Sequence, residues 1–146
     1  MQLLRTVSTF GATFEELKTI YIVFIRSLLE QSATVWHSSL TEENRNDLER
    51  VQKTAMKIIL DTRYKSYSQA LRTLEIESLD TRRQELCINF ARKAIKHPRF
   101  KHLFPSNNKI HQMKTRNPEK YKISRAFTER MKRSPIIYMQ KLLNES

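Results

Sequence analysis

The chain contains one glycine and four prolines in 146 residues, and this shortage limits the turns that it can form. Tight hairpin turns rely on glycine at positive φ, so a sheet of many short strands would need more glycine than is present. Apolar residues recur instead at helical spacing between short polar loops. The sequence therefore predicts an all-α fold: a small bundle of about four main helices, a basic flexible segment and a short C-terminal helix.

The first expected helix begins at a capping box. Glu16 follows Thr13 by three residues, the pattern in which each side chain caps a backbone N–H near the other. Apolar residues then recur as far as Trp36 over more than half of the helix circumference, so we expect neighbouring elements to cover this helix on several sides. The apolar positions are Phe14, Leu17, Ile20, Tyr21, Phe24, Ile25, Leu28, Leu29, Val35 and Trp36.

Three further helices are expected downstream, each bounded by a capping residue, a polar turn or a proline. Proline ends a helix because it lacks a backbone N–H and clashes with the preceding turn. The expected spans, with their bounding residues, are Thr41 to about Leu60, Ser68 to Leu74, and Ser78 or Asp80 to about His97, before Pro98.

Arg83 interrupts the apolar face of the last of these helices. An unpaired buried guanidinium would cost roughly several kcal/mol, so this side chain must reach a carboxylate or the edge of the core. We favour a buried pair that fixes packing, and a phosphate contact is the alternative. The apolar face around it consists of Leu79, Leu86, Cys87, Phe90 and Ala94.

The net charge of +12 is concentrated toward the C-terminus. Residues 1–73 hold 10 basic and 8 acidic residues, whereas residues 92–146 hold 15 basic and 3 acidic ones. Such a segment attracts phosphate backbones through counterion release, and a solvated, disordered tail is the alternative. The candidate nucleic-acid-binding residues are Arg82, Lys93 and Lys96 beside the apolar face of the fourth helix, and Arg125, Arg130, Lys132 and Arg133 in the tail.

The composition changes after Pro98, and this change predicts three segments. Residues 1–104 are expected to form the helical bundle. Residues 105–133 alternate polar and basic residues with isolated apolar ones, which predicts a basic flexible linker. Residues 134–146 begin with a serine and a proline, a pattern that predicts the start of a short terminal helix.

No catalytic residues are expected in this chain. Catalysis of nucleotide transfer by two metal ions requires an acidic motif of the Tyr-Xaa-Asp-Asp kind and a further carboxylate. The aspartates here, Asp47, Asp61 and Asp80, are isolated from one another. The only glycine, Gly11, excludes a glycine-rich phosphate loop, and no serine lies in a nucleophile elbow.

A zinc site could be assembled from the one cysteine and three histidines, but the spacing does not favour it. Cys87, His97, His102 and His111 are separated by nine, four and eight residues, unlike the compact pairs of zinc knuckles and fingers. We therefore expect no metal and no cofactor. A single cysteine fits a reducing cytosol or nucleus, and no apolar run is long enough to predict a membrane span.

Two aromatic groups are candidate base-stacking surfaces. Trp36 is expected to be a core residue at a helix end rather than a stacking platform. Tyr64 and Tyr67 lie beside Arg63 and Lys65, and this basic-aromatic surface is the better candidate of the two.

Four segments carry a specific resemblance: FIRSLLEQSATVWHSSL, LERVQKTAMKIIL, YKSYSQAL and RRQELCINFARK. They resemble the C-terminal, post-catalytic part of the polyprotein of non-LTR retrotransposons, the LINE elements of the jockey, CR1 and RTE-like kind. The resemblance covers about residues 3–104 and 134–144. Such elements often have Glu-Tyr where this chain has Glu30-Gln31, and often a glycine near Asp61.

The resemblance implies a helical region that follows the reverse transcriptase palm. We therefore expect a non-catalytic C-terminal fragment of an RNA-directed DNA polymerase, with weak, sequence-independent binding to RNA or DNA phosphates. The intact retroelement polymerase is a candidate partner, no membrane is expected, and the location is intracellular. The alternative is a host-recruited helical protein-interaction module without nucleic-acid function.

Overall fold

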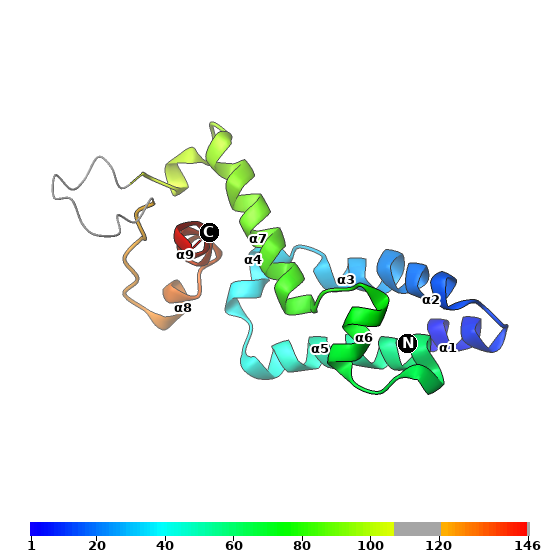
Figure 1. Cartoon of the computed structure of the whole chain (residues 1–146). Coiled ribbons are helices and arrows are strands. Elements are labelled where there is room, and N and C mark those ends of the chain that lie inside the picture. Colours follow the sequence, from blue (N-terminus) through cyan, green and yellow to red (C-terminus); the bar gives the residue numbers. More distant parts are fainter. Residues whose placement is uncertain (107–120, 146) are drawn as a thin grey trace. The chain divides into compact units, whose positions relative to one another are not determined.

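A computed structural model describes residues 1–106 and 121–145 of the chain (Figure 1). The expected all-α class is confirmed, because the described residues form helices joined by loops and no strand beyond one isolated bridge, Ser106 with Tyr121. The expected count of about four main helices with a short terminal helix is loose, because the described residues also form several short helices. The chain divides into two compact units: unit 1 comprises residues 1–32 and 40–82, and unit 2 comprises residues 33–39 and 83–146.

The two units alternate along the sequence, whereas the three predicted segments, 1–104, 105–133 and 134–146, follow one another. A short segment, 33–39, belongs to unit 2 although its neighbours on both sides belong to unit 1. Part of the expected linker, 107–120, lies outside the described residues. Compact units are defined by contacts between distant residues, and composition along the chain does not report these contacts.

Unit 1 is built from helices around one apolar core. Its elements are α1 (Gln2–Thr9), α2 (Phe14–Ile20), a π-helical segment (Tyr21–Arg26), α3 (Ser27–Glu30), α5 (Glu42–Leu60), a 3-10 turn (Asp61–Arg63), α6 (Tyr67–Leu74) and the first residues of α7 (Leu79–Lys96). The buried residues of this core are Leu4, Leu17, Tyr21, Ala55, Met56, Ile59, Leu60, Ala70, Leu74 and Ile76.

The helix starts in unit 1 follow the capping signals of the sequence. The Thr13 N–H donates to the Glu16 carboxylate at 2.7 Å and the Glu16 N–H donates to the Thr13 hydroxyl, which completes the predicted capping box. Thr41 caps α5, as predicted. The Ser78 hydroxyl accepts a hydrogen bond from the Thr81 N–H at 3.2 Å, so Ser78 and not Asp80 caps α7. Caps are interactions across three residues, which is why the sequence alone identifies them.

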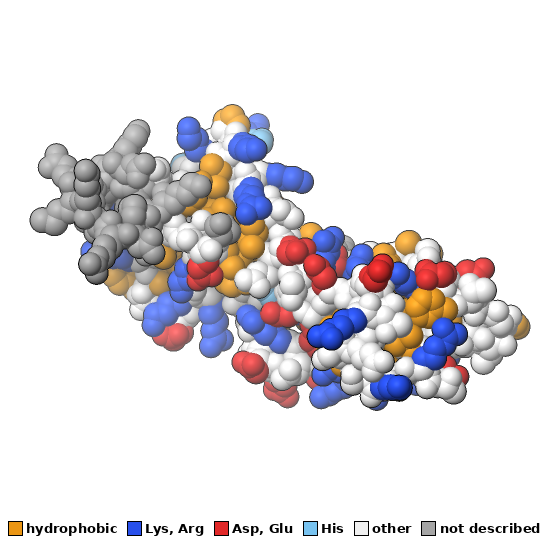
Figure 2. All heavy atoms as spheres, viewed as in Figure 1, with side chains coloured by type: hydrophobic (Ala, Val, Ile, Leu, Met, Phe, Trp, Pro, Cys, Tyr) orange, Lys and Arg blue, Asp and Glu red, His pale blue; other side chains and the backbone are white. Residues whose placement is uncertain are grey.

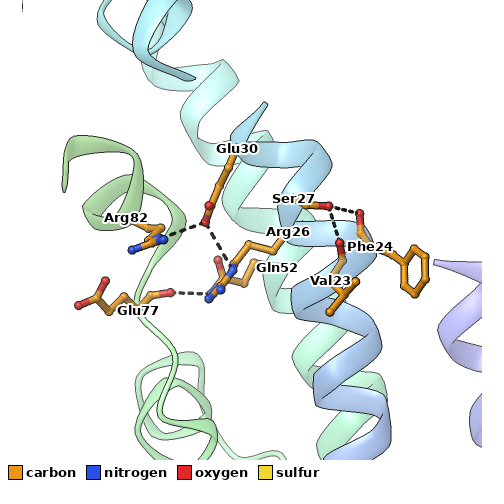
Figure 3. Close-up of polar contacts among 8 residues, drawn as sticks. All are labelled: Val23, Phe24, Arg26, Ser27, Glu30, Gln52, Glu77 and Arg82. Carbon is orange, nitrogen blue, oxygen red and sulfur yellow. Dashed lines mark hydrogen bonds and ion pairs between the residues drawn. The ribbon is translucent and has the colours of Figure 1, made fainter. Parts of the chain in front are cut away.

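The first expected helix is not continuous, and this prediction was wrong. The Ser27 hydroxyl donates to the carbonyls of Val23 and Phe24 within the π-helical segment (Figure 3). The helix then ends at Glu30, with Gln31 as its C-cap, and Ser32 adopts a left-handed φ of 54°. A non-glycine residue with this φ is strained and breaks the helical hydrogen-bond pattern. The residues beyond Ser32 fold in unit 2.

The expectation that neighbours cover this helix on several sides was also wrong. Leu17 and Tyr21 are buried in the core of unit 1. By contrast, Phe24 is 58% exposed and Leu28 is 71% exposed. The core of unit 1 contacts only one side of the apolar face of this helix, because α1 and α5 are the elements that pack against α2.

Unit 2 has its own apolar core, formed by residues distant in the sequence. Its elements are α4 (Ala33–Trp36), a 3-10 turn (His37–Ser39), α7 from Arg83 onward, a 3-10 turn (Lys101–Leu103), α8 (Glu129–Lys132) and α9 (Pro135–Glu145). The predicted terminal helix is α9. The buried core residues are Cys87, Ala91, Ala94, Phe104, Met139, Leu142 and Leu143.

Arg83 is completely buried, and an aromatic ring lies beside its charge. Its guanidinium carbon is 5.8 Å from the centre of the Trp36 ring, within the range of a cation–π interaction. Trp36 is itself half-buried at the end of α4. The buried position of Arg83 agrees with the prediction, whereas its contact with Trp36 was not foreseen. Of the apolar face expected around it, Phe90 is 44% exposed.

Replacing Trp36 with Ala should destabilise unit 2 by about 3 kcal/mol, because it removes a packed ring and the cation–π partner of a buried guanidinium. Chemical denaturation monitored by circular dichroism measures this change. Phe10→Ala, at a ring that is 85% exposed, is the control and should change the free energy of unfolding by less than about 0.5 kcal/mol. Near wild-type stability of the Trp36→Ala variant would contradict the proposed role of this contact.

Candidate nucleic-acid interface

The net charge of the protein lies outside unit 1. Unit 1 holds 11 basic and 11 acidic residues, whereas the described residues of unit 2 hold 12 basic and 3 acidic ones. Figure 2 shows red and blue side chains intermixed over unit 1, and blue side chains without red ones around the C-terminal end of α7. Because like charges gather on unit 2, its surface is the candidate site for a polyanion.

In unit 1, several opposite charges are paired with one another. The Glu30 carboxylate lies 3.5 Å from Nε of Arg26 and 3.4 Å from Nε of Arg82, so one acid links α3 to the start of α7 (Figure 3). Arg45 and Asp80 form another pair at 3.7 Å. Beside the first pair, the buried Gln52 amide donates to the Glu77 carbonyl at 2.9 Å. A phosphate at Arg82 would therefore have to compete with Glu30.

Two candidate residues, Lys93 and Lys96, lie in the last turns of α7. Both side chains are exposed. A cation in the last turn of a helix is also stabilised by the helix dipole. Arg99 and Lys101, which were not among the predicted site residues, are exposed directly after the helix. These four cations follow one another within nine residues, and the charge count of the tail was the only sequence signal for the last two.

Two amide side chains of α9 hold the basic segment that begins at Tyr121. The Asn144 amide accepts from the Tyr121 N–H at 2.9 Å and donates to the Tyr121 carbonyl at 3.0 Å. The Gln140 amide accepts from the Ser124 N–H at 2.8 Å. These bonds fix the backbone next to Arg125, whose side chain is exposed. In its described part, the segment expected to be a flexible linker is thus attached to α9.

The next three candidate residues lie on and after α8. Thr128 caps this short helix by accepting from the Met131 N–H at 3.2 Å. Lys132 forms an ion pair with Glu129, which holds the pKa of that carboxyl below its usual range. Arg130 and Arg133 are exposed, and the Arg133 carbonyl accepts a hydrogen bond from the Ser38 hydroxyl at 2.7 Å. The backbone is therefore anchored while the guanidinium groups face solvent.

Six of the seven predicted residues thus belong to unit 2, and Arg82 belongs to unit 1. The six are exposed side chains on two segments whose backbones are held by the core or by hydrogen bonds. Long exposed cations of this kind neutralise phosphates and carry no information about base sequence. The arrangement can bind a nucleic-acid backbone, and it has no built chemistry for reading bases.

The predicted basic-aromatic surface around Tyr64 and Tyr67 is engaged in contacts within unit 1. The Tyr67 hydroxyl donates to the Glu49 carboxylate, and burial together with this bond raises the pKa of Tyr67. Lys53 lies over the Tyr67 ring at 5.1 Å, and Lys57 lies over the Tyr64 ring at 5.6 Å. Both rings are half-buried against the core of unit 1. A base would have to displace these cations in order to stack there.

Cys87 is buried in the core of unit 2, as predicted from its place on α7. Burial raises the pKa of its thiol to about 11, and the nearby charge of Arg83 opposes this rise. Among residues 1–106 and 121–145, no three His, Cys, Asp or Glu side chains gather as metal ligands would. His111, the last member of the zinc hypothesis, lies outside the described residues. None of the described helices has the length and apolar character needed to cross a membrane.

Comparisons with known proteins found no relative of this chain: no protein-family model matches it, and no curated protein or solved structure is detectably similar.

The single thiol gives a direct test of the unit 2 core. Because the thiolate is the reactive form, a raised pKa and burial should slow the reaction of Cys87 with a disulfide reagent at pH 8. We expect a rate at least about 100-fold lower in the folded protein than in urea. Absorbance of the released thiol measures both rates. Equal rates would mean that α7 does not bury Cys87.

The two amides of α9 give a second test. Gln140→Ala leaves the Ser124 N–H and the Leu103 carbonyl without their bonds to this side chain, and should cost about 2–4 kcal/mol. Asn144 is less buried, so Asn144→Ala should cost about 1 kcal/mol. Urea denaturation provides the free energies. If both substitutions had no effect, the attachment of the basic segment to α9 would be refuted.

Proposed function

We propose that this chain is a non-catalytic C-terminal fragment of a LINE-type retrotransposon RNA-directed DNA polymerase. In this proposal, the fragment binds the phosphate groups of RNA or DNA. The resemblance of Phe24 to Leu40, Leu48 to Leu60 and Arg82 to Lys93 supports the origin. In this proposal, the chemistry of the parent polymerase lies in a part of the polyprotein upstream of this segment.

The observation that carries nucleic-acid binding is the separation of charge between the units. Unit 1 is neutral, whereas unit 2 presents an excess of nine cations among its described residues. Lys93 and Lys96 lie on one segment of unit 2, and Arg125, Arg130, Lys132 and Arg133 lie on another. A polyanion that contacts both segments releases counterions at each phosphate that it brings to a cation.

Binding of this kind is weak and independent of sequence. Exposed lysine and arginine side chains contact phosphates at little geometric cost, but they distinguish neither base nor strand. The affinity therefore falls steeply as the salt concentration rises. A helical region behind a polymerase palm needs this property, because it must hold a moving template of any sequence.

A second candidate function is a host-recruited protein-interaction module without nucleic-acid function. The observation that favours it is the exposed apolar strip of unit 1, formed by Val23, Phe24 and Leu28, which are each more than half exposed. Clustered apolar residues on a surface are typical of sites that bind another protein. The intact retroelement polymerase is the partner that the resemblance suggests. Binding through such a strip depends little on salt.

Removing four tail cations tests the first function. The variant Arg125→Gln, Arg130→Gln, Lys132→Gln and Arg133→Gln should bind labelled single-stranded RNA and duplex at least tenfold more weakly at physiological salt, by an order-of-magnitude estimate. The slope of log affinity against log salt should fall in magnitude by up to about 3.6 for duplex DNA. Fluorescence anisotropy at several salt concentrations measures both quantities, and thermal stability should stay nearly unchanged.

A matched variant in unit 1 controls for the loss of net charge. This variant removes three arginines and one lysine, as the tail variant does, from exposed positions of the neutral unit. The substitutions are Arg5→Gln, Arg50→Gln, Lys53→Gln and Arg72→Gln. This variant should bind RNA as the wild type does. If it bound as weakly as the tail variant, or if the tail variant bound normally, the interface on unit 2 would be refuted. Salt-independent binding to a protein with no binding to RNA would favour the second function.

A further inference from the structure

Unit 2 contains an apolar pocket of about 170 Å³ that the proposed function does not use. Its walls come from four separate parts of the chain: α4, the C-terminal half of α7, the segment 100–104 and the start of α9. All of these parts belong to unit 2. The side chains that shape the pocket include Val35, Phe90, Phe100, Phe104, Ile136 and Met139.

The pocket has a buried floor and an exposed rim. Phe104 and Met139 are buried members of the unit 2 core and form the floor. At the rim, Val35 is 65% exposed, Phe90 is 44% exposed and Phe100 is 43% exposed. Single exposed apolar residues need no explanation, but three around one apolar concavity indicate a binding surface.

Cations flank three of the four parts of the chain that form the walls: α7, the segment 100–104 and α9. Lys93 lies one helical turn after Phe90 on α7, and therefore on the same side of the helix. Arg99 and Lys101 are the chain neighbours of Phe100, and Lys132 and Arg133 precede α9. Between residues 83 and 106 the sequence holds a single acid, Glu85. Figure 2 shows hydrophobic side chains beside Lys and Arg over the C-terminal half of α7.

The chemistry of the pocket distinguishes between two kinds of anionic partner, a nucleic acid and an acidic peptide. Apart from Thr34, the side chains of the lining are apolar. A nucleobase placed there would lose the hydrogen bonds of its polar edges to water and gain almost none in return. A cavity of this size holds one group about as large as benzene. The leucine, methionine or phenylalanine side chain of a peptide is both apolar and small enough to enter the pocket.

We propose that unit 2 binds an acidic amphipathic peptide segment of a partner protein, with one apolar side chain in this pocket. Glutamate or aspartate side chains on both sides of that anchor contact Lys93, Arg99 and Lys101. The inference goes beyond the proposed function and does not depend on nucleic-acid binding. It rests on the charge complementarity between an acidic partner and the cations that flank the pocket, together with the apolar lining of the pocket.

A synthetic peptide provides the first test. The probe is a fluorescein-labelled peptide in which leucines recur at helical spacing and the other positions are Glu, Gln and Ala. Two control peptides are used: one with every Glu replaced by Lys, and one with the same composition but no shared apolar face. Anisotropy titration with the full chain should give binding of the probe, and at least about tenfold weaker binding of both controls.

Variants of the protein then locate the site. Phe90→Gln should weaken binding of the probe about tenfold, because it replaces an apolar wall by a polar side chain. Phe10→Gln, at an exposed phenylalanine of unit 1, should leave it unchanged. Arg99→Glu should also weaken binding by placing an acid at the rim, while Arg5→Glu should not. Circular dichroism confirms that each variant is folded, and the rim variant tests the site even if Phe90→Gln unfolds.

Three outcomes would overturn the inference: equal binding of the acidic and basic peptides, no effect of either unit 2 variant, or no binding of the probe. A further arm measures labelled single-stranded RNA with the same variants. If Phe90→Gln weakened RNA binding and left peptide binding unchanged, the pocket would hold a nucleobase and the peptide proposal would be wrong. Loss of RNA binding in the tail variant alone bears only on the proposed function.

Discussion

One buried amide holds unit 2 together. Gln140 is completely inaccessible to solvent, and its carboxamide bonds to the Ser124 N–H, the Ser124 hydroxyl and the Leu103 carbonyl. It thereby connects α9 both to the segment after α7 and to the basic segment before α8. A buried amide must have its hydrogen bonds satisfied, so these segments have little freedom to move away from α9. Both the cationic surface and the apolar pocket depend on this arrangement.

The separation of charge between the units gives the molecule two different surfaces. In unit 1, Glu30 pairs with Arg26 and Arg82, so charges of both signs neutralise one another locally. In unit 2, the described residues hold 12 cations and only 3 acids, so the fields of the cations add. The same cations flank an apolar pocket. Unit 2 therefore combines a long-range attraction for anions with a short-range preference for an apolar group.

The success of the sequence-based expectations depended on the range of the interactions involved. The caps at Thr13 and Thr41 involve residues three positions apart, and they were correctly anticipated, while Ser78 was one of two alternatives for the cap of α7. The break at Ser32 was missed, because it follows from the assignment of residues 33–39 to a different unit. The two amide residues Gln140 and Asn144 lie four residues apart on a helix rich in apolar residues, and this spacing was a usable signal for its anchoring role. That signal was overlooked.

By itself, the sequence determined the helical class, the starts of α2, α5 and α9, the buried position of Arg83 and the concentration of cations toward the C-terminus. These properties follow from glycine content, from local capping and from periodicity. Only the tertiary structure decided that Phe24 and Phe90 are exposed, that Trp36 lies beside Arg83, and that the described tail is anchored to α9. The physical reason is that exposure and pairing depend on which distant segments pack together. A periodic pattern identifies an apolar face, but it does not specify what covers that face.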